Sequence, residues 1–143
     1  MPSRCKSRIL WAYMADHFNS DFFVGNRNRL RKLFQGTAPI ILTANGLLQQ
    51  STDSTYPFKQ DGNFWYITGI NEPDVIVVLD GDQEYLILPN QSEYQLHFNG
   101  ALDPTRLSAI SGITKVLGQK EGWELLGKRL KKSKNVATLT PSP

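Results

Sequence analysis

The residues that most often carry catalysis are few and scattered in this sequence. His17 and His97 are its only histidines and lie far apart, so neither has a second histidine at the spacing of a helical metal site. Cys5 is a lone cysteine near the amino terminus, where a thiolate lacks a fixed electropositive pocket. We find no phosphate-binding glycine loop, no Gly-x-Ser-x-Gly elbow and no cysteine pair for zinc.

The carboxylates give no clearer indication of chemistry. Two of them could meet in space and act as an acid–base pair, but the sequence favours no pair among Asp53, Asp61, Glu72, Asp74, Asp80 and Asp82. The sequence therefore predicts no self-contained catalytic site.

The segment 51–73 is the most unusual part of the chain. Five aromatic residues fall within eleven positions: Tyr56, Phe58, Phe64, Trp65 and Tyr66. Rings with a polar tip suit a surface that contacts a partner and stays wet on one side. The same rings could instead fill the core beneath a long crossover between two strands. Composition leaves both interpretations open.

Length and patterning predict one α/β domain with a mixed sheet flanked by helices. The apolar runs at 38–44 and 75–79 predict buried strands, the first in a central position of a sheet covered on both faces. Asp80-Gly81-Asp82 before the run at 84–88 predicts an antiparallel hairpin. Short strands are also expected at 113–117 and 135–139.

Helices are expected between these strands. A stripe of apolar residues predicts an amino-terminal helix, followed by a break at 19–21. The next helix, 24–34, would turn Leu30, Leu33 and Phe34 inward, with Gly36 as its C-cap. Its basic residues would face solvent: Arg27, Arg29, Arg31 and Lys32. Further helices are expected at 92–98, from Asp103-Pro104 onward, and at 119–132.

Charge and hydropathy limit the partners. The net charge of +3 is small, so we expect no nucleic-acid partner, although basic clusters at 27–32 and 128–134 would be the surfaces to test. The apolar run at 9–15 follows basic residues as in a signal peptide, but seven residues are at the short limit for one. No stretch approaches the ~20 apolar residues of a membrane span. We expect a cytoplasmic protein without a membrane partner.

Positions 53–73 read DSTYPFKQDGNFWYITGINEP. This run resembles the signature of the amino-terminal domain of Xaa-Pro aminopeptidases (aminopeptidase P, of the creatinase or pita-bread metallopeptidase family). The family pattern is close to D-S-x-Y-P-[YF]-R-Q-x-[SD]-x-F-[YW]-Y-[LF]-T-G-F-x-E-P. The resemblance divides the chain into an amino-terminal extension (1–23), the aminopeptidase P amino-terminal domain (24–139) and the start of a linker (140–143).

The resemblance implies a creatinase-like, non-catalytic domain that contributes to oligomerisation and lines a substrate cleft. A further domain, expected beyond this chain, would hold two divalent metal ions, commonly manganese, and remove the residue before a proline. The chain itself would hold no cofactor, no metal ligand and no catalytic residue. The implied partners are a proline-containing peptide and further copies of the protein. The residues implied to contact the cleft or a neighbouring subunit are Trp65, Tyr66, Phe64, Tyr56 and Asp53.

One departure from the family and one alternative remain. Many relatives carry an arginine-containing stretch after the second hairpin strand, whereas this chain has HFNGAL at 97–102, which removes the basis for an arginine contact with substrate. The same fold also implies an alternative, a non-enzymatic protein-binding module of the kind found in histone-chaperone subunits. The Tyr56-Pro57 pair and the run at 64–66 are closer to the peptidases.

Overall fold

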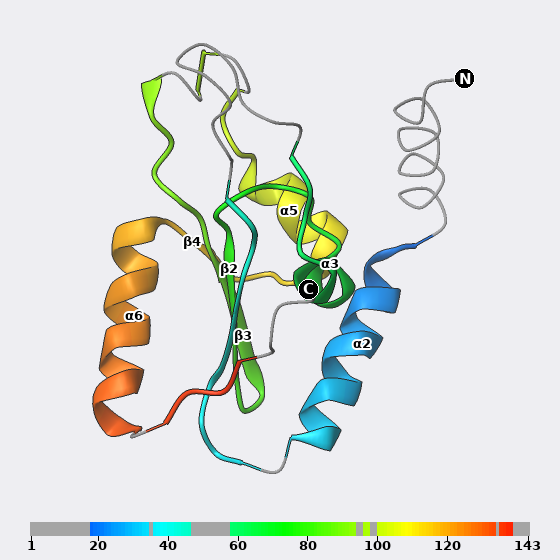
Figure 1. Cartoon of the computed structure of the whole chain (residues 1–143), viewed down its shortest axis with the longest axis vertical. Helices are drawn as coiled ribbons and strands as arrows, with labels where there is room; N and C mark the ends of the chain where they lie inside the picture. The colour runs from blue at the N-terminus through cyan, green and yellow to red at the C-terminus, as the bar shows by residue number, and fades with distance from the viewer. Residues whose placement is uncertain are drawn as a thin grey trace.

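A four-stranded mixed sheet is the middle layer of the protein. The computed structural model describes residues 18–34, 36–46, 58–93, 96–97, 100–133 and 135–138. The strands lie in the order β1 (Ile40–Thr43), β2 (Ile76–Asp80), β3 (Gln83–Ile87) and β4 (Val116–Leu117). β1, β2 and β3 pair antiparallel, and β4 is parallel to β3. The predicted α/β fold with a mixed sheet is confirmed (Figure 1).

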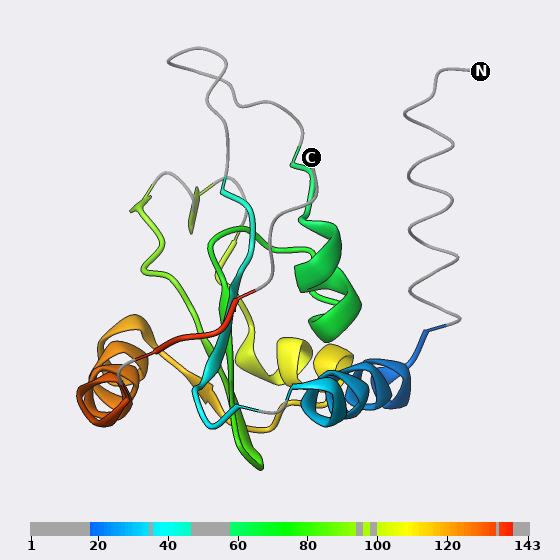
Figure 2. The same ribbon diagram turned by 60° about the horizontal axis from the view of Figure 1, so that its bottom comes forward.

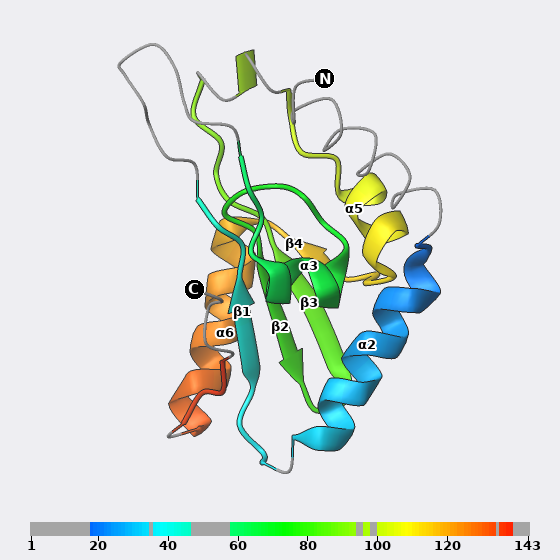
Figure 3. The ribbon, with the colours of Figure 1, turned by 45° about the vertical axis from the view of Figure 1, so that its right-hand side comes forward.

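Helices cover both faces of the sheet. α2 (Ser20–Leu33), α3 (Gly62–Thr68) and α5 (Pro104–Ser111) lie together on one face, and α6 (Gln119–Lys132) lies alone on the other (Figures 1 and 2). α3 contacts α2, α5 and β1, so it lies between α2 and the sheet (Figure 3). No helix in the described ranges is long and apolar enough to cross a membrane.

Strand alternation divides the apolar residues between two cores. Val77 and Leu79 of β2 join the core beneath α3 and α5, whereas Val78 joins the core beneath α6. Successive side chains of a strand point to opposite faces, so a continuous apolar run supplies both cores at once. This is why 75–79 lacks the polar alternation of a half-exposed strand.

The expected central position of the first strand is wrong. β1 stands at the end of the described strand order, and its outer edge carries only an isolated bridge. The Ile41 N–H donates to Ala137 O, and the Ala137 N–H donates to Pro39 O. Within 135–138, the predicted last strand is this bridge alone. Helices cover both faces of the sheet, so an edge strand here is as apolar as a central one.

α2 differs from its prediction at both ends. Asn19, expected to lie in a break, is the N-cap and accepts from Phe22 N, so the helix begins at Ser20. Gly36 is not the C-cap, because Phe34 already has an extended backbone at that position. The predicted inward face is also wrong in part: Leu33 is 81% exposed and Arg27 is fully buried.

α3 is an element that the sequence patterns did not indicate. The Asp61 side chain accepts from Phe64 N at its start, and Gly69 ends it with a positive φ of 71°. A Cβ at Gly69 would lie 2.3 Å from the Phe23 ring, so only glycine fits there. The aromatic run at 64–66 therefore lies on one short helix.

The remaining elements agree with the sequence. The β2–β3 hairpin turns at Gly81-Asp82, with φ 59° at Gly81. Asp103 caps α5, with Pro104 in its first turn. α6 has the predicted bounds of 119–132, and β4 is shorter than the predicted strand. Of the predicted helix at 92–98, residues 93 and 96–97 are helical, and Leu96 N donates to Ser92 O. The expected helix at the amino terminus lies outside the described residues.

Two glycines of α6 give a paired test of this packing. A Cβ at Gly122 would lie 2.6 Å from Ile87 Cγ1, close to the rigid branch of that side chain, whereas a Cβ at Gly127 would meet nothing within 4 Å. We expect Gly122→Ala to lower the free energy of unfolding by about 1–3 kcal/mol through overpacking. Gly127→Ala should raise it by roughly 0.5–1 kcal/mol. Urea denaturation measures both, and equal effects would contradict the close contact between α6 and β3.

Candidate aromatic contact site on α2 and α3

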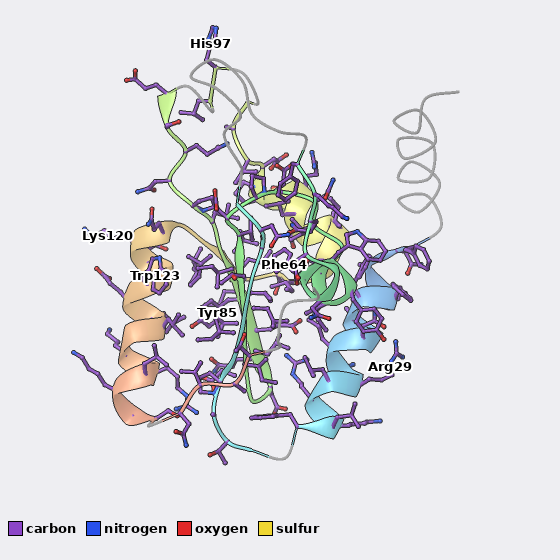
Figure 4. The ribbon with its side chains drawn as sticks, in the orientation of Figure 1. Arg29, Phe64, Tyr85, His97, Lys120 and Trp123 are labelled. Atoms are coloured by element: carbon purple, nitrogen blue, oxygen red, sulfur yellow. The ribbon has the colours of Figure 1, made fainter. Side chains whose placement is uncertain are left out.

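The three consecutive aromatic residues of α3 have different surroundings. Phe64 is fully buried in the core, so its ring supports the helix and does not reach the surface (Figure 4). Trp65 is partly exposed, and Tyr66 is 44% exposed. Successive helix positions point about 100° apart, so a three-residue run necessarily divides between core and surface.

The outward rings of α3 meet aromatic rings of α2 and the ring of Phe18, which precedes α2. Trp65 packs edge-on against Phe23, with centroids 5.3 Å apart, and against Phe18 at 5.9 Å. Tyr66 packs edge-on against Phe22 at 6.2 Å. Such T-shaped pairs are favoured by the ring quadrupoles. The result is a continuous aromatic cluster in which Phe23 is buried, and its outer rings, with Tyr66 the most exposed, form an aromatic surface.

Side chains of α2 fix the carboxyl end of α3. Asn26 Nδ2 donates to Tyr66 O at 2.7 Å, and Arg27 Nη1 donates to Ile67 O at 2.9 Å. The last carbonyls of a helix have no partner within it, so these two bonds supply what the helix lacks. Asn26 and Arg27 are both buried. The orientation of Tyr66 therefore depends on α2.

Arg27 is itself held by a carboxylate of the sheet. Glu84 on β3 accepts from Arg27 Nε at 2.8 Å and from Arg31 Nη2 at 2.8 Å. Burial would raise the pKa of the Glu84 carboxyl. The hydrogen bonds and charges of Arg27 and Arg31 outweigh burial and lower that pKa below its ordinary value of 4.5. The carboxylate is thus stabilised in the charged form that α2 requires.

The opposite face of the hairpin carries a second ion pair. Arg129 on α6 donates to both oxygens of Asp80 on β2, at 3.0 and 2.9 Å, and to Thr37 O at 2.7 Å. Burial and the nearby charge of Asp80 raise the pKa of Tyr85 on the same face. Each helix layer is therefore joined to the hairpin by an arginine.

Gln60 organises the backbone around α3. Its Oε1 accepts from Asn45 N and Asp61 N, and its Nε2 donates to Ile70 O and Glu72 O, all at 3.0–3.1 Å. The residue is 8% exposed, so these bonds are largely shielded from water. One amide thus joins the end of β1 to both ends of the crossover helix. These four bonds give Gln60 a role in folding the segment around α3.

The structure places the predicted site residues as follows. Trp65 and Tyr66 lie together on the outward side of α3, and Phe64 lies in the core. Asp53 and Tyr56 lie outside the described residues. Sequence reasoning missed Asn26 and Arg27, and no local pattern indicated them, since their partners are 40 residues or more away.

The described residues do not form a metal site. No group of three or more His, Cys, Asp or Glu side chains in the described ranges could hold a metal ion. His97 is exposed at the far end of the molecule from the hairpin (Figure 4). The described side chains therefore do not fit a metal-binding role, and no metal-dependent step is assigned to them.

Comparison with known proteins identifies the family. The model of the aminopeptidase P N-terminal domain matches residues 23–138. The chain belongs to this family. The resemblance of residues 53–73 is thereby confirmed, and the chain carries the N-terminal domain of aminopeptidase P.

The relatives are much longer than this chain. Over 105 residues the chain is 37% identical to the Xaa-Pro aminopeptidase of Escherichia coli. The matched region covers 73% of this chain and 22% of that protein. Over 68 residues it is 37% identical to the Xaa-Pro aminopeptidase of Haemophilus influenzae, and the match covers 48% of this chain and 16% of that protein. The chain spans less than a quarter of either protein.

Solved structures show the same fold. A protein from Bacillus anthracis described as an aminopeptidase P superimposes with a TM-score of 0.77 at 27% identity, over 88% of this chain and 32% of that one. The low-pH form of aminopeptidase P from Escherichia coli gives a TM-score of 0.67 at 24% identity, over 79% of this chain and 27% of that one. The helix–sheet–helix layers of this chain are thus the fold found in these aminopeptidase P structures.

The Glu84 carboxylate makes the free energy of unfolding depend on pH. Its pKa is lower in the folded than in the unfolded chain, so its contribution is full above pH 4.5 and is lost as the pH falls through the folded pKa. We expect Glu84→Gln to be less stable than the natural chain at neutral pH, and the difference in unfolding free energy to shrink below pH 4.5. Urea denaturation over a pH series measures it. A difference that stays constant with pH would contradict the assigned ion pairs.

Gln60 gives a test of the aromatic segment's framework. Gln60→Met keeps the side-chain size but leaves Asn45 N, Asp61 N and two carbonyls without their partner. We expect a loss of about 2–4 kcal/mol in unfolding free energy, because unsatisfied groups keep their desolvation cost. Gln83→Met, at an exposed position of β3, should change it by less than about 0.5 kcal/mol. Similar losses for the two variants would show that Gln60 has no special role.

Proposed function

We propose that this chain is the non-catalytic N-terminal domain of a metal-dependent Xaa-Pro aminopeptidase, in which it contributes to oligomerisation and lines the substrate cleft. A C-terminal domain outside this chain then removes the N-terminal residue before a proline, using two divalent metal ions, commonly manganese. The part of this chain that the structure describes supplies contacts and no reacting group.

The observation that carries this proposal is the placement of the family's aromatic run. Phe64 holds α3 in the core, while Trp65 and Tyr66 lie on its outward side against the rings of α2. A rigid aromatic surface with a hydroxyl tip suits contact with a short peptide or with a neighbouring subunit. Tyr66 is the first contact residue, and Trp65 supports it and adds its exposed part.

The partners follow from this role. They are a proline-containing peptide, reached through the parent enzyme, and further copies of the protein. With an exposed His97 and no arginine in the run at 97–102, Tyr66 and Trp65 are the better candidates for a substrate contact. A cytoplasmic location stays a prediction.

The test uses the longest natural product of the gene. We expect it to hydrolyse an Xaa-Pro peptide with added manganese, and the 143-residue chain alone to be inactive. Tyr66→Ala should lower kcat/KM about tenfold if the tyrosine contacts the peptide. Trp65→Phe, which keeps a ring against Phe23, should lower it less. Light scattering on the same variants reports whether oligomerisation changes with activity.

Trp123→Ala is the matched control. Trp123 is an aromatic residue 47% exposed on α6, across the sheet from α3, so its removal should leave kcat/KM unchanged. An equal loss in both variants would contradict a specific contact by Tyr66. Inactivity of the longest product would sink the aminopeptidase proposal and favour the protein-binding module.

A further inference from the structure

Arg29 differs from the other arginines that the structure describes. Four of them pair with a carboxylate: Arg27 and Arg31 with Glu84, Arg106 with Glu72, and Arg129 with Asp80. Arg29 has no carboxylate partner within the described residues, and its side chain is exposed on the outer side of α2 (Figure 4). Its charge is therefore available to a partner.

The guanidinium of Arg29 is nevertheless held in place. Its Nη2 donates to Asn26 Oδ1, and its Nη1 would lie 3.6 Å from a Cβ at Gly25, so the side chain folds back along α2. Asn26 is 1% exposed, and this buried amide fixes one corner of the fork. The other N–H groups have no partner among the described residues, and the side chain as a whole is exposed.

The same amide joins Arg29 to the aromatic surface. Asn26 Nδ2 donates to Tyr66 O at 2.7 Å while its Oδ1 accepts from Arg29. Phe22, two helical turns before Arg29, packs edge-on against the Tyr66 ring. The free edge of a guanidinium and two partly exposed rings therefore share one surface, built on a buried asparagine.

This combination suits a particular ligand chemistry. A guanidinium fork binds a carboxylate through two parallel hydrogen bonds. The neighbouring rings offer an apolar contact to the residue beside that carboxylate. A lysine in place of Arg29 would provide charge without the fork.

We propose that Phe22, Arg29 and Tyr66 form a recognition site for a protein segment in which an acidic side chain stands next to an apolar one. The inference deepens the contact role of Tyr66 and rests on it in that respect. It names Arg29 as the residue that selects for acidic partners. It needs no peptidase activity, so it can fail independently of the proposed function.

The test is a binding titration on the full 143-residue chain. The probe is the blocked peptide acetyl-Leu-Glu-Leu-Glu-Leu-amide, and its neutral twin carries Gln in place of Glu. We expect the acidic peptide to bind, to shift the NMR signals of Arg29 Nε–H and the Tyr66 ring, and to bind about tenfold more weakly to Arg29→Gln. Arg29→Lys should bind the acidic peptide roughly threefold more weakly than the natural chain, since lysine keeps the charge but lacks the planar fork.

Lys128→Gln is the control for unspecific charge attraction. Lys128 is an exposed cation on α6, across the sheet, and its removal should leave the affinity unchanged. The inference is overturned if the natural chain does not bind the acidic peptide, if the neutral twin binds equally well, or if Lys128→Gln weakens binding as much as Arg29→Gln.

Discussion

The buried guanidinium of Arg27 is the contact on which the arrangement of the helices depends. It is fully buried, and its three nitrogens donate to two elements at once: Nε and Nη2 to Glu84 on β3, and Nη1 to Ile67 O on α3. A buried cation is tolerated only when its charge and donors are satisfied, and removing one partner of such a pair typically costs about 3–5 kcal/mol. The position of α2 is thereby fixed relative to both the sheet and the helix that carries Trp65 and Tyr66.

The hairpin at β2 and β3 serves as the common support of both helix layers. Glu84 faces α2 and Asp80 faces α6, because neighbouring register positions on the two strands point to opposite faces. Each carboxylate meets an arginine of the helix above it. Packing of Leu and Val alone would allow a helix to slide along the sheet, whereas an arginine–carboxylate pair has one preferred geometry. The two ion pairs therefore add position to a stability that comes mainly from the apolar cores.

The sequence predicted those parts of the fold that local patterns control. Asp-Gly between two apolar runs predicted the hairpin, and the amphipathic period predicted α6, since turn chemistry and helix period need no knowledge of the rest of the chain. The position of β1 at the edge was not predictable, because strand order is a tertiary property and both faces of the sheet are covered. Arg27 was predicted to face solvent for the same reason, since its carboxylate lies 57 residues along the chain.

The candidate site shows the same division between local and distant information. α3 is only seven residues long, with Phe64, Trp65 and Tyr66 in succession, so no apolar stripe indicated a helix. The residues that could have indicated this helix are its two caps, Asp61 and Gly69, and they do so only when they are considered together. Several residues of the segment that resembles the family thus serve folding: Gln60 joins the backbone around α3, Asp61 caps its start and Gly69 ends it. This framework leaves Tyr66 the most exposed of the three aromatic residues of α3, although its ring packs edge-on against Phe22.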